Sequence, residues 1–413
     1  MTPAGTTLDA AWWTFDGSEP SASRHDATGP SVVRTFAPGV WTVRFKATYN
    51  GTTYALDRPN WFTRYGRTVY LVAENADAAF PYGTRATAAT NLNEALACAL
   101  DGATLLVDDG VYASSAQEIN YALTVRSVHG PDYTTFDGNN KGSSFVVNHA
   151  DVVFDGIRFW RGKGYIDSGA VRLNATATAA MVTNCVFDSC RVESYGGGGA
   201  VLYAGTLVDC VFTNCSLFAR DQSGAALVAK GNAFVDRCQF LDSGYTGDIK
   251  ADGAVCLEGS AVMRNSVVAR SSLSGTGGIV AKSHAQVLNC TVTWNRTSGE
   301  GMTGGVAVSN SSVVVRNTIA WGNRNDATDE VSELFGPEGC FDHVCTEDPR
   351  FRRGKRPFDI STDSPCRHAG VTEEWMAGAK DVYGRARLFS SNKPVDIGAA
   401  ACSVRAGVIV RMK

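Results

Sequence analysis

The sequence predicts an all-β protein built on a right-handed parallel β-helix, a coil of short strands stacked in register. Short strand-forming phrases repeat about every 25 residues between positions 150 and 325, a period too short for a propeller blade. Glycine is abundant, with 43 residues, and no helical periodicity separates the phrases. A single coil cannot bury its apolar face alone, so we expect stacked coils to enclose one continuous core.

One recurring phrase has an apolar residue, then Cys or Asn about three positions later, then another apolar residue. The Cys or Asn positions are 185, 210, 238, 265, 290 and 317. We interpret them as small residues at a tight inner bend, with reduced cysteines that pack as small hydrophobes. Their spacing is not that of a zinc site, which needs pairs two to four residues apart.

The same phrase predicts a ladder of buried side chains, because equivalent positions of stacked coils lie above one another. The predicted ladder contains Phe187, Phe212 and Phe240 and continues through Val267, Val292 and Ile319. A second phrase, glycine and a small residue before a short strand, precedes each copy of the first. Its six copies begin at Gly169, Gly199, Gly224, Gly253, Gly277 and Gly304.

The repeats lie between two different flanking regions. Residues 1–67 predict a small β-sandwich-like module, and residues 68–402 the β-helix with its amino-terminal cap and a closing segment. Residues 403–413 are a tail or the start of a further region. Within the cap, residues 91–100 have apolar side chains three and four positions apart, which predicts a helix. Such a helix protects the open end of a solenoid.

Composition and charge narrow the classes of partner. The formal net charge is −3 with mixed signs, which argues against a nucleic-acid partner. No apolar stretch has the roughly 18 residues of a membrane-spanning helix, and Met1 is not followed by a secretory signal. The sequence is therefore either cytoplasmic or a fragment that lacks its own signal. We expect a monomer or part of a larger multidomain chain.

Several stretches resemble those of pectin-lyase-like β-helix proteins of secreted bacterial type. These are Asp348-Pro349-Arg350-Phe351, Asp363-Ser364-Pro365-Cys366 and Asp396-Ile397-Gly398-Ala399. The resemblance covers roughly residues 68–402 and implies an extracellular or cell-surface location. The amino-terminal region resembles a divergent PKD-type module through Trp13-Thr14-Phe15-Asp16-Gly17. The β-helix fold carries lyases, hydrolases and adhesins, so fold alone does not define activity.

The longest acidic loop holds the candidate catalytic and metal residues. A β-helix lyase needs a base beside carboxylates that bind calcium and neutralise a uronate. Asp242, Asp248 and Asp252 are the candidate calcium ligands, with Lys250 and Asp248 as candidate catalytic residues. The alternative interpretation is an ordinary solvated loop. A glycoside hydrolase is less favoured, because the Gly-His-Gly stretch of that family is absent.

Candidate glycan-binding residues fall into two groups. Lys230, Glu258 and Lys282 occupy equivalent places in three successive coils and predict either a surface ladder of weak ion pairs or a strip that binds a sugar acid. Aromatic residues near the loops offer flat faces for sugar rings, with core or bend packing as the alternative. They are Tyr195, Phe218, Tyr245, Trp294 and Trp321.

The sequence leaves two functions open. The first is a secreted or surface β-helix protein that binds a polysaccharide or surface glycan without a complete catalytic set. The second is a carbohydrate-active enzyme, above all a calcium-assisted polysaccharide lyase. The sequence favours the first, because no loop contains a complete catalytic set.

Overall fold

The computed structural model describes residues 7–37, 39–114, 116–142, 145–218, 224–245, 252–388 and 393–402, with the backbone alone for Tyr245. The chain divides into two compact units, Met1–Asp108 and Asp109–Lys413. The predicted domain boundary after residue 67 falls inside the first unit. Among the described residues, no helix has the length and apolar character needed to cross a membrane.

The first unit begins with an antiparallel sheet in the order β2-β1-β3-β4. Its strands are β1 (Ala10–Thr14), β2 (Ala27–Thr28), β3 (Gly39–Tyr49) and β4 (Thr52–Arg64). The described part of this region holds this one sheet, so the second layer of a sandwich and the PKD resemblance stay predictions. A parallel pair, β5 (Thr68–Leu71) and β6 (Ala103–Val107), follows.

The predicted helix of the first unit is confirmed as α1 (Leu92–Cys98), with the 3-10 turn η1 (Arg85–Thr87) before it. The Asn91 side chain accepts hydrogen bonds from the backbone N–H groups of Asn93 and Glu94, which caps the first turn. Leu92, Ala95, Leu96 and Cys98 are buried. These residues recur at helical spacing, so one face of α1 packs against β5.

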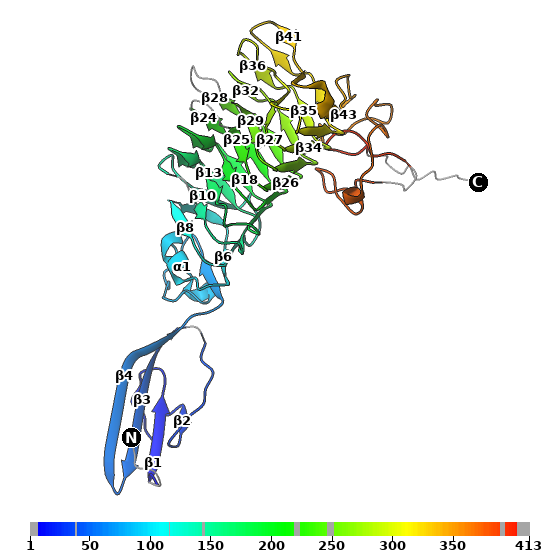
Figure 1. Ribbon diagram of the computed structural model, residues 1–413. Helices are drawn as coiled ribbons and strands as arrows, with labels where there is room; N and C mark the ends of the chain where they lie inside the picture. Colours follow the sequence, from blue (N-terminus) through cyan, green and yellow to red (C-terminus); the bar gives the residue numbers. More distant parts are fainter. Residues whose placement is uncertain are drawn as a thin grey trace, which may run out of the picture. The chain divides into compact units, whose positions relative to one another are not determined.

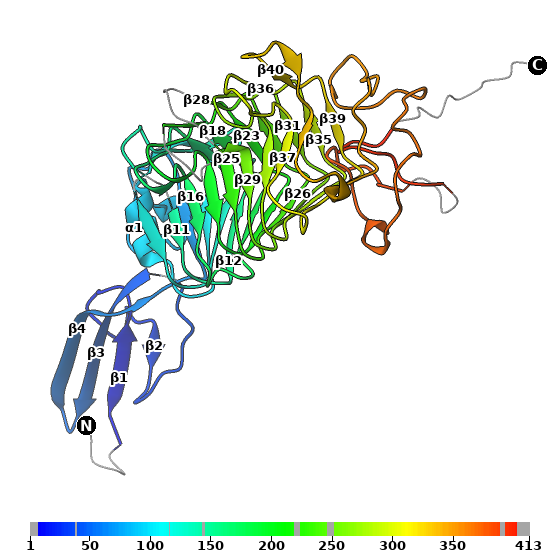
Figure 2. The same ribbon diagram turned by 45° about the horizontal axis from the view of Figure 1, so that its top comes forward.

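The second unit is a parallel β-helix, as predicted, with strands stacked coil upon coil (Figures 1 and 2). Each complete coil contributes a strand to a first sheet, a second sheet, a narrow sheet of two-residue strands and a third sheet, in that order. The first sheet contains β9 (Leu123–Ser127), β12 (Val152–Asp155), β17 (Met181–Thr183), β22 (Thr206–Val208), β26 (Phe234–Asp236), β30 (Val262–Arg264), β34 (Gln286–Leu288), β38 (Val314–Arg316) and β43 (Phe341–Asp342). The second contains β7 (Gly110–Ala113), β10 (Thr134–Asp137), β13 (Arg158–Trp160), β18 (Val186–Asp188), β23 (Val211–Thr213), β27 (Gln239–Leu241), β31 (Val267–Ala269), β35 (Thr291–Thr293) and β39 (Ile319–Trp321).

The other two sheets complete the coil. The narrow sheet contains β14 (Lys163–Gly164), β19 (Arg191–Val192), β24 (Ser216–Leu217), β28 (Gly244–Tyr245), β32 (Ser272–Leu273), β36 (Arg296–Thr297), β40 (Arg324–Asn325) and β41 (Glu330–Val331). The third contains β8 (Gln117–Ile119), β11 (Phe145–Val147), β15 (Asp167–Ser168), β16 (Val171–Leu173), β20 (Gly196–Gly197), β21 (Ala200–Leu202), β25 (Gly224–Ala229), β29 (Gly253–Leu257), β33 (Ile279–Ala281), β37 (Val306–Val308) and β42 (Leu334–Phe335). The 3-10 turns η2 (Glu338–Cys340) and η3 (Glu374–Met376) follow.

The predicted phenylalanine ladder is confirmed in the interior of the second sheet. The ring centroids of Phe187 and Phe212 are 4.2 Å apart, and those of Phe212 and Phe240 are 4.8 Å apart. The continuation through Val267 and Ile319 is wrong by one residue. Phe240 pairs with Val268, which leads to Val292 and then to Ala320. Side chains alternate between the faces of a strand, so Val267 and Ile319 point outward.

The same register corrects the predicted bend column. Strand pairing places Cys185, Cys210, Cys238, Ser266, Cys290 and Thr318 above one another. The predicted members Asn265 and Asn317 each lie one residue before the true column positions, 266 and 318. Their backbone φ angles are 50° and 52°, in the left-handed region that Asn tolerates. Every true member donates to the carbonyl two residues before it, as with Cys238 to Asp236 at 3.3 Å and Ser266 to Arg264 at 2.7 Å. All twelve cysteines are free thiols.

The carboxyl-terminal region closes the structure by folding over the outer face of the second sheet (Figures 1 and 2). We call residues 345–402 the closing segment. The outward-facing Thr291 is fully buried, and Ala399 of the closing segment donates its N–H to the Thr291 hydroxyl at 2.9 Å. Ile319 is likewise covered, by Ile360 and Ile397. Within the described residues, the closing segment therefore covers the outer face of the last strands of the second sheet.

Candidate functional site

The acidic loop residues that the structure describes are held by cations. Both carboxylate oxygens of Asp242 accept hydrogen bonds from Arg270 of the next coil, each at 2.8 Å. Asp252 accepts a hydrogen bond from the Lys282 ammonium at 2.6 Å. Asp248 and Lys250 lie outside the described residues. The calcium site and its base therefore stay predictions, and the two described carboxylates already have positive partners.

The predicted charge column on the third sheet is in register. Lys230, Glu258 and Lys282 each follow the strand end in successive coils, β25, β29 and β33. Lys230 pairs with Glu258 at 3.1 Å, whereas Lys282 pairs with Asp252. These half-exposed pairs are typical of a surface ladder, in which each pair contributes about 0–1 kcal/mol.

The two predicted tryptophans lie under the closing segment. The ring centroids of Trp294 and Phe351 are 5.4 Å apart, and Trp321 lies 6.1 Å from the same ring. Trp294 also packs near Phe358. This arrangement favours the packing role that the sequence left open for both residues.

Two other predicted aromatics, Tyr195 and Phe218, are exposed beside the narrow sheet, with exposed fractions of 59% and 57%. The Tyr245 backbone lies in the same sheet, paired with Leu217. Its side chain is outside the described residues. The exposed predicted aromatics thus gather along the flank formed by the narrow sheet.

An open groove of about 520 Å³ lies along this flank. Strand register stacks the residues that follow β14, β19 and β24, which are Tyr165, Glu193 and Phe218. Tyr165 is 75% exposed, and the two aromatic residues are two coils, roughly 10 Å, apart along the stack. A carboxylate therefore lies between two exposed rings. We call these three residues together with Arg191 the flank groove.

Charge in the flank groove is arranged asymmetrically. The Glu193 carboxylate pairs with the Lys163 ammonium of the preceding coil at 2.7 Å. Arg191 lies in the same column as Lys163, is exposed, and makes no ion pair with any described residue. The flank groove thus offers a carboxylate acceptor, a guanidinium donor and two apolar ring faces. These are the groups that hold the hydroxyls and the ring faces of a sugar.

Sequence reasoning missed Tyr165, although a signal was present. Tyr165, Glu193 and Phe218 each stand six residues after a ladder phenylalanine, namely Phe159, Phe187 and Phe212. The Phe159 and Phe187 rings are stacked at 5.0 Å, so the ladder extends one coil earlier than predicted. The predicted ladder begins at Phe187, one coil later, so it does not lead to Tyr165.

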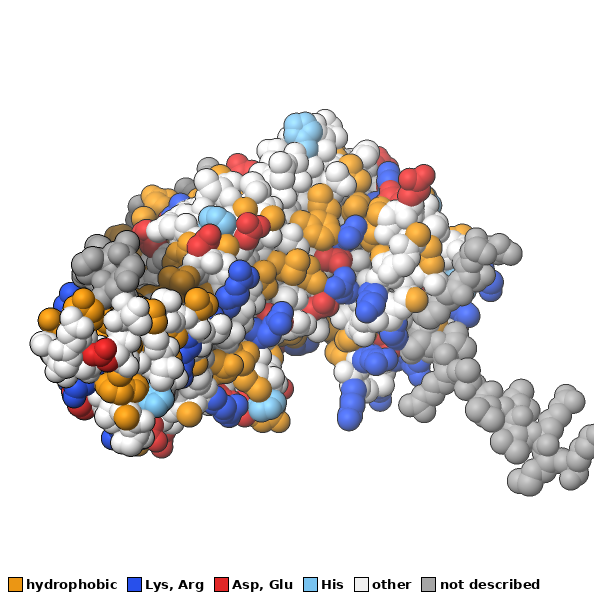
Figure 3. Space-filling model, turned by 90° about the horizontal axis from the view of Figure 1, so that it is seen from below, with side chains coloured by type: hydrophobic (Ala, Val, Ile, Leu, Met, Phe, Trp, Pro, Cys, Tyr) orange, Lys and Arg blue, Asp and Glu red, His pale blue; other side chains and the backbone are white. Residues whose placement is uncertain are grey.

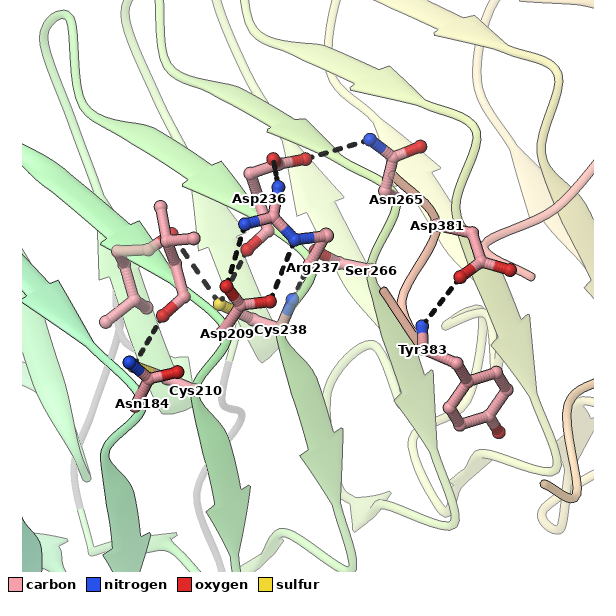
Figure 4. Close-up of polar contacts among 12 residues, drawn as sticks. Asn184, Asp209, Cys210, Asp236, Arg237, Cys238, Asn265, Ser266, Asp381 and Tyr383 are labelled. Atoms are coloured by element: carbon pink, nitrogen blue, oxygen red, sulfur yellow. Dashed lines mark hydrogen bonds and ion pairs between the residues drawn. The ribbon is translucent and has the colours of Figure 1, made fainter. Parts of the chain in front are cut away.

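A partly buried charge cluster between the first and second sheets is architectural (Figure 4). Arg237 donates to both carboxylate oxygens of Asp209, at 2.8 and 2.7 Å. Asp236 accepts from the Asn265 amide at 2.9 Å. The hydrogen bond to Asp209 raises the pKa of Arg237 above its ordinary value. Every charge here has a partner from a neighbouring coil, so the cluster ties coils together and leaves no group poised for chemistry.

A second exposed surface is basic. Figure 3 shows Lys and Arg side chains gathered over the closing segment. Its loop 350–356 contains Arg350, Arg352, Arg353, Lys355 and Arg356, all exposed. Arg350 pairs with Asp363 at 2.9 Å, and Arg356 lies over the Tyr383 ring. This loop would attract polyanions in general, and it lacks the exposed ring faces of the flank groove.

Comparison with known proteins gives matches to solved structures only. No protein-family profile matches the sequence. No curated protein sequence matches it. Pectin methylesterase PemA from Erwinia chrysanthemi has 13% identity and a TM-score of 0.38, covering 71% of this chain and 92% of its own. A rhamnogalacturonan lyase has 11% identity and a TM-score of 0.36, covering 61% and 87%. The PL6 family alginate lyase AlyGC has 15% identity and a TM-score of 0.34, covering 65% and 41%.

The strand pairing makes the chain a parallel β-helix protein, as the sequence predicted. At the identities and TM-scores of these matches, the similarities carry no inference about activity. Whether and how this chain binds carbohydrate has to be argued from its own flank groove.

Proposed function

We propose that this protein is a secreted or cell-surface β-helix protein that binds a polysaccharide or surface glycan in the flank groove. The observation that supports the proposal is the stacking of Tyr165, Glu193 and Phe218 along an open groove. The rings would contact the apolar faces of sugar rings, and Glu193 and Arg191 would exchange hydrogen bonds with hydroxyls or a carboxylate.

The repeated geometry suits an extended chain rather than a single small molecule. The narrow sheet runs along the coil stack, so the flank groove follows the direction in which coils repeat. A polymer lying along it would meet one aromatic face, then the charged residues, then the second aromatic face. Since the sheet is held by backbone pairing, the site is largely formed before ligand arrives, which limits the entropy lost on binding.

The test is a binding titration against a panel of neutral and acidic polysaccharides. The double variant Tyr165→Ala/Phe218→Ala is expected to bind at least about tenfold more weakly than the wild type, because each ring contributes apolar contact. Tyr133→Ala is the matched control, since Tyr133 is 61% exposed in the same unit but outside the flank groove. Equal weakening by both variants, or unchanged binding of the double variant, would refute the assignment.

The same panel separates binding from lysis. A lyase would release unsaturated uronate products that absorb in the ultraviolet, with calcium present or removed by a chelator. Appearance of that absorbance would replace the binding proposal with the lyase alternative. A different result would place the site on the basic loop. In that case binding would disappear at high salt and after substitution of Arg352 and Arg353, but it would survive the aromatic double variant.

A further inference from the structure

Two cysteines hold the closing segment at its start and near its middle. Cys345 pairs with the last strand of the second sheet, donating its N–H to Thr318 O and accepting from Ala320 N, both at 2.9 Å. Cys366 accepts a hydrogen bond on its carbonyl from Ile397 N at 2.9 Å. The chain between them, residues 346–365, includes Phe351, which packs against Trp294.

The two cysteines share one apolar environment. Cys366 belongs to the buried cluster that contains Ile319 and Ile397, and the partly buried Cys345 packs against this cluster. A hydrogen bond between the two side chains shifts the pKa of both thiols. Cys366 is fully buried, while Cys345 is half-buried at its edge. Cys345 is the one free thiol of the described chain that is not buried. An accessible sulfur thus lies directly beside an enclosed one.

We propose that Cys345 and Cys366 are an oxidisable pair that forms a disulfide and fixes the closing segment over the second sheet. The oxidant we name is a small-molecule disulfide such as oxidised glutathione. The Cys345 thiolate attacks one of its sulfurs, forming a mixed disulfide and releasing one glutathione thiolate. Cys366 then loses its proton and attacks the Cys345 sulfur, which releases the second glutathione thiolate. Two protein thiols are oxidised, and one small disulfide is reduced to two thiols.

The environments of the two sulfurs fit this order of events. The hydrogen bond with Cys366 lowers the pKa of Cys345 to about 7, so much of it is thiolate at neutral pH. Burial instead raises the pKa of Cys290, in the bend column, to about 12. The cysteines of the bend column are all buried, so oxidation is expected to select the pair in the closing segment.

The bond would act on a region that is not held by coil-to-coil strand pairing. Residues 346–365 carry Phe351, Phe358 and Ile360, which cover the outer face of the second sheet. Closing this loop restricts the unfolded chain more than the folded one. The inference does not depend on glycan binding, because the pair and the flank groove share no residue.

The experiment uses the whole protein, first reduced, then freed of reductant and incubated with oxidised glutathione. Mass spectrometry of peptides kept under non-reducing conditions is expected to find one disulfide, between Cys345 and Cys366, and the remaining thiols free. A tryptic peptide that contains Cys345 also contains Cys340. Cys340→Ser is therefore the matched control and keeps the linkage, whereas Cys345→Ser abolishes it.

Several outcomes would overturn the proposal. One is a Cys345–glutathione mixed disulfide that persists, which would mean that Cys366 cannot reach it. Another is linkage of Cys366 to Cys402, which lies in the same cluster. A third is two free thiols after the incubation. The oxidised wild type is expected to melt about 5 °C higher than the reduced protein, and an unchanged or lower melting temperature would refute the fixing role.

Discussion

The rings of Phe187 and Phe212 lie face to face, with centroids 4.2 Å apart and planes 6° apart. Strands stack about 4.8 Å apart, so identical rings at paired positions are brought to stacking distance by the backbone itself. Both rings are fully buried. The ladder is therefore a consequence of strand register as much as of side-chain preference.

The first prediction concerns this ladder. Phe212→Ala is expected to lower the free energy of unfolding by about 3–5 kcal/mol, because it leaves a cavity between two rings that cannot close up. Phe218→Ala is the matched control in the same coil, where the exposed ring contributes within about 0.5 kcal/mol. Denaturant unfolding followed by circular dichroism measures both. Equal losses for the two variants would contradict the assignment of inner and outer faces.

The second prediction concerns the bend column. Cys290 donates its Sγ–H to Leu288 O at 3.4 Å. In the preceding coil, the Ser266 hydroxyl donates to Arg264 O in the same way. Cys290→Ser keeps the donor and is expected to cost less than about 1.5 kcal/mol, whereas Cys290→Val leaves a buried carbonyl without this donor and costs about 1–3 kcal/mol. Denaturant midpoints compare the two variants. A serine variant less stable than the valine variant would show that the hydrogen bond is unimportant.

The ladder and the bend column together show which parts of the fold could be predicted from the sequence and which could not. Phe187, Phe212 and Phe240 mark the register plainly, so the coil and the ladder could be predicted. Beyond Phe240 the ladder contains only aliphatic residues, and Val267 and Val268 are adjacent, so apolarity no longer distinguishes the two faces. In the bend column, Ser266 and Thr318 donate to the carbonyl two residues earlier, as the cysteines do. The column therefore has one kind of hydrogen bond but three residue types, so residue identity alone does not mark it.

The candidate site was harder to predict, for a physical reason. Tyr195 and Phe218 are near loops and are exposed, as expected from local sequence. Trp294 has the same local signals, yet the closing segment covers it, through contacts more than 50 residues away. Burial by a distant segment leaves no trace in the residues around Trp294. Tyr165 could have been found by counting six residues from Phe159.

The third prediction is a pH dependence at Cys345. Its pKa is lowered to about 7 by the hydrogen bond with the Cys366 thiol, so thiolate forms as pH rises through neutrality. The rate of iodoacetamide alkylation at Cys345 is expected to rise several-fold between about pH 6 and pH 8, with its midpoint near pH 7, and then to level off. Cys366→Ala removes the hydrogen bond and is expected to move the midpoint upward, toward the ordinary thiol value. An unchanged midpoint in that variant would refute the stated cause, with the buried Cys290 serving as the unreactive reference.

The last prediction concerns how the closing segment is attached. The Asn317 amide accepts from Val371 N and donates to Val371 O, both at 2.8 Å, as a strand neighbour would. Asn317→Ala removes both bonds and places alanine at φ 52°, so we expect a loss of about 2–4 kcal/mol in the stability of this attachment. Asn184→Ala is the matched control, because Asn184 has the same φ but an exposed side chain outside the closing segment. Amide hydrogen exchange at Val371 and neighbouring residues is expected to accelerate in the first variant and not in the second. Equal acceleration in both variants would assign the effect to backbone strain at the bend, and no acceleration in either would mean that the closing segment is held without Asn317.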